Sequence, residues 1–211
     1  NRMISVDKFL SFIVPYADSV PDHVAKQATI KAANKFCTQT LIWQEEFPVV
    51  VAHPGDYIRA PIPDWASIVK YMYVSYNGLK LNSTTRDAVL SANSIDVGRL
   101  QGTPQVYYQA SADSIRLVPA SEKHGEVRMV IALTPSLSSD KVPSILFDRY
   151  FEAITNGALA DIKQIQGQSY SDPQAAIVYK ELFAQGVREA KNEAVRTLGR
   201  NAGRVNFQRI L

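Results

Sequence analysis

The residue types that most often perform chemistry are few in this chain, and they are poorly spaced for it. The 211 residues include three histidines, His23, His53 and His124, and one cysteine, Cys37. No two histidines stand at the helical spacing that holds a metal ion, so we expect each to be solvated or locally hydrogen-bonded. Cys37 falls on the apolar side of a predicted helix, which indicates a buried structural thiol. A cysteine nucleophile would need a histidine and a second base brought to it by the fold.

The carboxylates offer no clearer acid–base pair. Asp148 and Glu152 are four residues apart, which places like charges on one face of a helix. Arg149 stands beside them, so the pattern favours a solvated face or a salt bridge between subunits. Glycine-rich phosphate loops and the nucleophile elbow of hydrolases are absent from the sequence. We therefore predict that the protein is not an enzyme and has no catalytic, cofactor-binding or metal-binding residues.

Tyrosines gather on the predicted strands. Such side chains suit core or interface packing, because they combine a large apolar ring with a polar tip. An aromatic strand can also stack nucleic-acid bases, but the surrounding strands lack the interleaved arginines expected of such a surface. Packing is the favoured interpretation for this set, which comprises Tyr71, Tyr73, Tyr76, Tyr107 and Tyr108.

The last fourteen residues, LGRNAGRVNFQRIL, form the most unusual segment of the chain. They include basic and apolar side chains but no acidic one. An exposed tail gains nothing from apolar groups, so this composition predicts an arm that is buried against another protein. Alternating apolar and polar residues near its end suit an extended segment that adds a strand to a sheet or lies in a groove. The residues assigned to this contact are Arg200, Arg204, Val205, Phe207, Arg209, Ile210 and Leu211.

Composition places the rest of the chain among ordinary globular proteins. Hydrophobic residues make up 46% and charged residues 20% of the sequence, and the net charge is +3. This mild basicity does not by itself predict nucleic-acid binding. A single cysteine excludes an internal disulfide and fits a reducing compartment. No apolar run approaches the roughly 20 residues of a membrane span, and no signal peptide is evident, so we expect a soluble protein made in the cytoplasm.

The order of predicted elements is helical, then β, then helical, which defines an α+β fold. We expect N- and C-terminal helices at 1–46 and 141–197 to form one helical bundle. Residues 47–140 read as an inserted small antiparallel β-sandwich or barrel, and residues 198–211 as the extended C-terminal arm. Within the β module, Asn77-Gly78 is a strong hairpin signal, and residues 84–95 predict a short helix on a connection.

Local signals define the main helices. Pro21 suits the first turn of a helix that continues through the alanine-rich stretch after it, and Asp172 is placed to cap a helix that begins at Pro173. Gly157 and Gly186 lie inside predicted helices, where each costs about 1 kcal/mol against alanine, so we expect close helix crossings there. The buried face of the last helix is predicted to consist of Val178, Leu182, Val187, Ala190 and Ala194.

Several ordered motifs give the chain a family resemblance that covers nearly its whole length. They are AANKFCTQTLIWQEE, GDYIRAPIPDW, YNGLKL, GTPQVYY, LVPA, RYFEAITNGALADI, SDPQAA and YKELFAQGVREAK. In this order they resemble the head-to-tail adaptor family of short-tailed bacteriophages, also called tail tubular protein A or gatekeeper proteins. Each motif is weak alone, and the specificity lies in the ordered set.

The resemblance implies a structural virion protein of the neck and tail, assembled in the host cytoplasm, with no enzymatic activity and no cofactor. It implies a twelve-fold ring of identical subunits between the portal protein and the tail nozzle protein, around the DNA channel. The helical bundle would face the portal, the β module the nozzle, and the C-terminal arm would bind the portal. Contact with packaged DNA would be non-specific.

Two further interpretations of the sequence stay open. The chain could be a neck protein that binds DNA without sequence specificity, or a neck or tail completion protein of another type of tailed phage. A tail-borne cell-wall hydrolase is the enzymatic alternative, but the paired carboxylates or metal ligands that it needs are not evident in the sequence.

Overall fold

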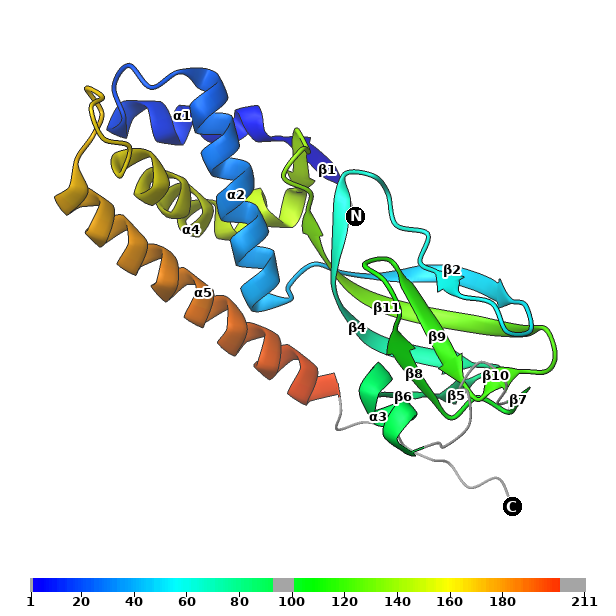
Figure 1. Ribbon diagram of the computed structural model, residues 1–211. Helices are drawn as coiled ribbons and strands as arrows, with labels where there is room; N and C mark the ends of the chain where they lie inside the picture. The colour runs from blue at the N-terminus through cyan, green and yellow to red at the C-terminus, as the bar shows by residue number, and fades with distance from the viewer. Residues whose placement is uncertain (1, 93–100, 202–211) are drawn as a thin grey trace. The chain divides into compact units, whose positions relative to one another are not determined.

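The computed structural model describes residues 2–92 and 101–201, and it divides at 42/43 and 134/135 into a helical unit and a β unit (Figure 1). The described residues form a mixed α+β fold, as the sequence predicts.

The helical unit is built from the two ends of the chain. Three long helices form its body, and a two-stranded antiparallel sheet, β1 with β12, ties the first described residues to the start of the penultimate helix. The elements are β1 (Met3–Ser5), η1 (Val6–Phe9), α1 (Leu10–Ile13), η2 (Val14–Tyr16), α2 (Asp22–Thr40), β12 (Lys141–Pro143), α4 (Ser144–Lys163) and α5 (Pro173–Asn201).

Local signals in the sequence place the starts of two helices to within one residue. Pro21 precedes α2 in an extended conformation, and Asp172 caps α5 by accepting a hydrogen bond from the backbone N–H of Ala175 at 3.0 Å. The helix α2 ends where Leu41 adopts a left-handed φ of 54°, which is uncommon for a residue other than glycine.

The helices α4 and α5 run antiparallel and side by side, and α2 packs against both (Figure 1). Aromatic rings fill the contact, with Phe36 of α2 lying 5.2 Å from Tyr150 and 6.3 Å from Phe183 between ring centroids. The short segment η1–α1 packs on the other side of α4, where Phe9 meets Phe147 edge to face at 5.2 Å. Most of the apolar residues that the sequence spaces helically on α2 and α4 thus form one bundle core.

Two glycines allow the helices to approach closely, as the sequence predicts. A Cβ atom built on Gly186 would lie 2.6 Å from the Cβ atom of Ala153, far inside the ordinary contact distance. A Cβ atom on Gly157 would lie 2.7 Å from the ring of Phe183 and 2.9 Å from the Cβ atom of Ala32. The helix-propensity cost of each glycine is therefore offset by packing that no other residue permits.

The β unit contains two four-stranded sheets and one short helix. The strand orders are β2-β11-β4-β5 and β3-β9-β8-β6, and a further short pair joins β7 to β10. The elements are β2 (Gln44–Ala52), β3 (Ile58–Arg59), β4 (Ala66–Tyr76), β5 (Leu79–Lys80), β6 (Asn82–Ser83), α3 (Arg86–Ala92), β7 (Gln101–Gly102), β8 (Val106–Gln109), β9 (Ser114–Val118), β10 (Ala120–Ser121) and β11 (Gly125–Pro135).

Of the two predicted architectures, sandwich or barrel, the closed barrel does not form among the described residues, and the β unit is not wholly antiparallel. The pairs β6–β8 and β7–β10 are parallel, whereas β2–β11, β3–β9 and β8–β9 are antiparallel. Closure needs paired edge strands, but three of the four edge strands, β3, β5 and β6, contain only two residues each. The fourth, β2, has nine residues and no edge strand of similar length with which to form a continuous ladder of hydrogen bonds.

Alternating tyrosines build the core of the β unit. The rings of Tyr71 on β4 and Tyr107 on β8 meet edge to face at 6.2 Å, so they join the two sheets. Tyr108 points to the opposite side of β8 and packs with Val118 and with Val89 of α3. The sequence predicts both the short helix α3 and the Asn77-Gly78 hairpin. These two residues have φ angles of 47° and 81°, as a two-residue hairpin turn requires.

The unit boundaries lie earlier in the chain than the sequence indicates. Glu45 and Glu46, which the pattern assigns to a helix end, belong to β2 and pair with Ile131 and Val130 of β11. At the other end of the chain, α5 continues to Asn201, so residues 198–201 are helical instead of starting the extended arm. Residues 202–211 lie outside the described part of the structure.

Candidate assembly surface

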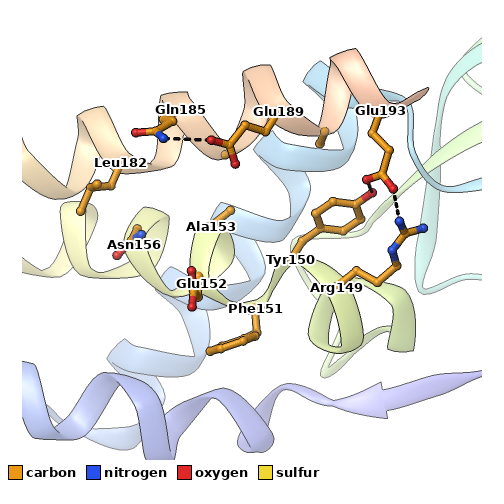
Figure 2. A pocket seen from close by; sticks show the side chains of 12 residues that line it. Arg149, Tyr150, Phe151, Glu152, Ala153, Asn156, Leu182, Gln185, Glu189 and Glu193 are labelled. Atoms are coloured by element: carbon orange, nitrogen blue, oxygen red, sulfur yellow. Dashed lines mark hydrogen bonds and ion pairs between the residues drawn. The ribbon is translucent and has the colours of Figure 1, made fainter. Parts of the chain in front are cut away.

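An open groove of about 480 Å³ runs between α4 and α5 (Figure 2). At its end, α4 is kinked at Tyr150, where φ is −128° and ψ is 18°. The Tyr150 hydroxyl donates a hydrogen bond to Glu193 of α5 at 2.9 Å, and Arg149 forms an ion pair with the same carboxylate. Earlier in α5, the side-chain amide of Gln185 donates a hydrogen bond to the carboxylate of Glu189 at 2.9 Å.

Tyr150 keeps its proton throughout the ordinary pH range. Its burial, and then its hydrogen bond to Glu193, raise the pKa of the phenol to about 12. The hydroxyl therefore acts as a hydrogen-bond donor that fixes the Glu193 carboxylate. The sequence favours a solvated face or a salt bridge between subunits for Arg149. Its side chain is 54% exposed, and its ion-pair partner is Glu193 of the same chain.

The acidic character of the groove comes from side chains on both helices. Glu152 on α4 and Glu189 on α5 line it, and neither has a basic partner among the described residues. Glu189 and Glu193 are four residues apart on α5, so their charges repel one another across one helical turn. Arg149 balances one of the three carboxylates. We call this surface, defined by Arg149, Glu152, Leu182, Glu189 and Glu193, the acidic groove.

The prediction for the buried face of α5 is wrong in part. Val187 and Ala190 are buried, but Val178 is 58% exposed and Leu182 is 41% exposed. Leu182 and Val187 are five residues apart, which separates them by about 140° around the helix axis. The two exposed residues therefore lie outside the bundle core, and Ile177 beside them is 66% exposed. Exposed apolar groups gathered on one helix are typical of an interaction surface.

The histidines are less isolated than their spacing indicates. His53 and His124 lie on neighbouring turns of the β unit, where their rings meet edge to face at 4.8 Å between centroids. The sequence separation of 71 residues hides this contact, which depends on the pairing of β2 with β11. Among the described residues, no group of three or more His, Cys, Asp or Glu side chains is placed to hold a metal ion.

Four of the five strand tyrosines belong to the core of the β unit. Tyr71, Tyr76, Tyr107 and Tyr108 are buried, which confirms the packing interpretation for them, whereas Tyr73 on β4 is half-buried. Burial raises the pKa of Tyr71 and of Tyr107. Their ring faces are therefore occupied by protein and are not presented to nucleic-acid bases.

Cys37 is fully buried on α2, as the sequence predicts. Burial raises the pKa of its thiol to about 12, so the reactive thiolate is scarce at neutral pH. We expect a bulky thiol reagent to label native protein only when the helical unit opens. Cys37→Ser should lower the free energy of unfolding by about 1 kcal/mol or more, because it places a hydroxyl in an apolar site.

A matched control makes this prediction testable. Thr38 is exposed on the next position of α2, so a Cys37→Ala/Thr38→Cys chain should label at the rate of a free thiol. Mass spectrometry of timed samples measures both rates. Native Cys37 that labels as fast as the control would show that the site is accessible.

The arm residues proposed from sequence fall mostly beyond the described part of the chain. Arg200 lies within α5. The other six residues, Arg204, Val205, Phe207, Arg209, Ile210 and Leu211, lie outside the described residues. The acidic groove is not evident in the sequence, because its side chains come from two helices and neither helix alone encodes their relative register.

The groove between α4 and α5 carries two carboxylates without a basic partner among the described residues and borders exposed apolar side chains. This combination is typical of a protein that acts through contacts with other proteins. The model of the SU10 adaptor protein family matches residues 15–206, and the chain belongs to this family of phage head-to-tail adaptors.

Membership of a structural adaptor family implies a non-enzymatic protein of the phage virion that contacts other virion proteins. No curated protein matches the chain. In the described part of the chain, each helix is too short or too polar to cross a membrane.

Proposed function

We propose that this chain is one subunit of a twelve-fold ring that joins the portal protein to the tail nozzle protein and surrounds the DNA channel. The helical unit faces the portal, the β unit contacts the nozzle, and the C-terminal arm binds the portal. The observation that carries the proposal is the family match over residues 15–206, which makes the chain an adaptor.

The surface of the helical unit supports an assembly role. Ile177, Val178 and Leu182 expose apolar area on α5 although the bundle core is complete without them. Burial of each side chain against a partner would contribute roughly 1.5–3 kcal/mol before ordering costs. In a ring, the linked copies raise one another's effective concentration, so individually weak contacts produce a stable assembly.

The arm supplies the attachment in this proposal. Arg200, Arg204 and Arg209 are basic and no acid stands near them in the sequence, so they steer the arm toward acidic residues of the portal. Val205, Phe207 and Ile210 supply the apolar area that is buried. Contact with packaged DNA in the channel is non-specific and sensitive to salt.

Electron microscopy of negatively stained mixtures tests this function. Full-length chain added to purified portal rings should produce portals that carry an additional ring of density on one face, with twelve-fold symmetry in class averages. A portal from an unrelated phage serves as the control and should stay bare. If the cognate portals also stay bare at micromolar concentrations of the chain, it is not a portal-binding adaptor.

A further inference from the structure

The helix α5 carries side chains of opposite charge on opposite flanks. Glu189 faces the acidic groove, and Lys180 lies nine residues before it, which is two and a half helical turns. The two side chains therefore point in nearly opposite directions. The same separation occurs on α4, where Glu152 lines the acidic groove and Asp161, nine residues later, lies on the other flank.

That other flank is a second groove between α2, α4 and α5, and it is basic. Lys31 and Lys35 of α2 both pair with Asp161, at 3.1 and 3.4 Å between nitrogen and oxygen. Lys35, Asp161 and Lys180 line this groove, and Lys31 lines the depression next to it, which shares Asp161. Lys180 has no acidic partner among the described residues. Three lysines against one aspartate leave a net charge of +2. We call this surface, defined by Lys31, Lys35, Asp161 and Lys180, the lysine groove.

The acidic groove is its counterpart in charge. Three carboxylates, from Glu152, Glu189 and Glu193, face the single guanidinium of Arg149, which leaves a net charge of −2. Neither set of charges is neutralised within the described part of the unit. The two grooves have opposite net charge and lie on opposite flanks of the α4–α5 pair. They cannot meet within one copy, but the acidic groove of one copy can meet the lysine groove of another.

Both flanks also expose apolar area that a partner could cover. Leu182 lines the acidic groove, and Val178, one helical turn earlier on α5, extends this exposed apolar patch. Beside the lysine groove, Leu137 is 65% exposed and lines a shallow depression together with Ile165, Lys31 and Asp161. Each flank thus combines an apolar patch with charges of one sign, which is the composition of a specific protein contact.

We infer that the acidic groove of one copy binds the lysine groove of the next, in a head-to-tail contact between copies of this chain. A contact between two different surfaces repeats from copy to copy and closes into a ring when the rotation allows it. The inference rests on the proposed ring function and adds which surfaces join the subunits. The occupant of each groove is a second copy, because the complementary charge is present on the chain itself.

Two variants, each changed only at exposed side chains, test the contributions of the two grooves independently. Glu152→Lys/Glu189→Lys changes the acidic groove from a net −2 to a net +2, derived from the charges above. Gln39→Glu/Lys180→Glu changes the lysine groove from a net +2 to a net −1. None of these four residues has an ion-pair partner among the described residues, so both variants should keep the fold, as circular dichroism can verify.

The decisive measurement is association of each variant alone and of both mixed. Each variant alone repels its own copies, and we expect its association to be at least about tenfold weaker than that of the unaltered chain. In an equal mixture, each altered groove meets a groove of opposite sign, so alternating copies should associate within about threefold of the unaltered chain. An alternating ring is possible because twelve is even.

Association is measured in two formats, by sedimentation equilibrium of the full chain at low and high salt, and by ring completion on portals. The inference would be overturned if either variant alone associates as strongly as the unaltered chain, or if the mixture associates no more strongly than each variant alone. The inference would also be overturned if the unaltered chain contacts its own copies neither in solution nor on portals. Portals decorated normally by either variant alone would overturn the inference but leave the adaptor function intact. Bare portals with the unaltered chain, together with rescue in solution, would overturn only the proposed function.

Discussion

Deletion of residues 205–211 should leave the melting temperature of the protein nearly unchanged and abolish its stable binding to the portal. The described bundle core is complete without these residues, since its buried side chains all come from earlier positions. Their removal therefore costs the folded subunit little. In the proposed assembly, the same residues provide the attachment to the portal.

The size of the effect follows from the apolar side chains. Burial of Val205, Phe207 and Ile210 contributes roughly 1.5–3 kcal/mol each. Ordering a free segment costs about 1–2 kcal/mol per residue, so backbone hydrogen bonds to the portal must contribute as well. A net loss of about 3 kcal/mol per subunit corresponds to a Kd increase of roughly 100-fold. Across linked subunits, a loss of this size prevents ring formation on the portal.

Binding to immobilised portal measures this Kd, and two full-length controls locate the effect within the arm. Val205→Ser/Phe207→Ser/Ile210→Ser keeps the length and charge of the arm and should bind as poorly as the truncated chain. Asn206→Ser/Gln208→Ser changes the alternate polar positions and should bind normally. Truncated chains that decorate portals with unaltered affinity would show that the arm is not the anchor.

Gly186→Val should destabilise the helical unit by about 3 kcal/mol, because α4 and α5 touch at this point. A Cβ atom there would lie 2.6 Å from the Cβ atom of Ala153, and the Cα atom of Ala153 would be only 3.5 Å away. A valine side chain adds two more carbons, so the helices must separate. The gain in helix propensity over glycine, below about 1 kcal/mol, does not offset this loss.

A pair of smaller substitutions tests whether the helix contact is the cause. Gly186→Ala alone places one methyl group against another, whereas Ala153→Gly/Gly186→Ala moves the methyl group from α4 to α5 and keeps one between them. We expect the double variant to be more stable than Gly186→Ala alone in urea unfolding. If Gly186→Ala is more stable than the original chain by the full helix-propensity gain of about 1 kcal/mol, the helices separate at no cost and the contact is not the cause.

The sequence alone predicts the parts of the fold that backbone preferences control. Pro21 and the Asp172 cap locate two helix starts, and Asn77-Gly78 locates a hairpin, because each depends on residues adjacent in the chain. The succession of helical and β segments is correct for the same reason. The family resemblance also comes from such local motifs taken in order, and the match over residues 15–206 confirms the adaptor family.

The tertiary structure decided which faces and residues meet. Apolar periodicity predicts that Leu182 lies in the core, but α5 carries apolar residues on more than one flank. The helices α2 and α4 pack against a different flank and leave the one with Leu182 exposed. The ion pair of Arg149 with Glu193, and the contact of His53 with His124, join residues far apart in sequence. The described sheets do not close into a barrel, which was one of the two predicted architectures, and three of their four edge strands have only two residues each. Such contacts depend on the registers of whole helices and strands, which no single segment encodes, and the two oppositely charged grooves arise from them.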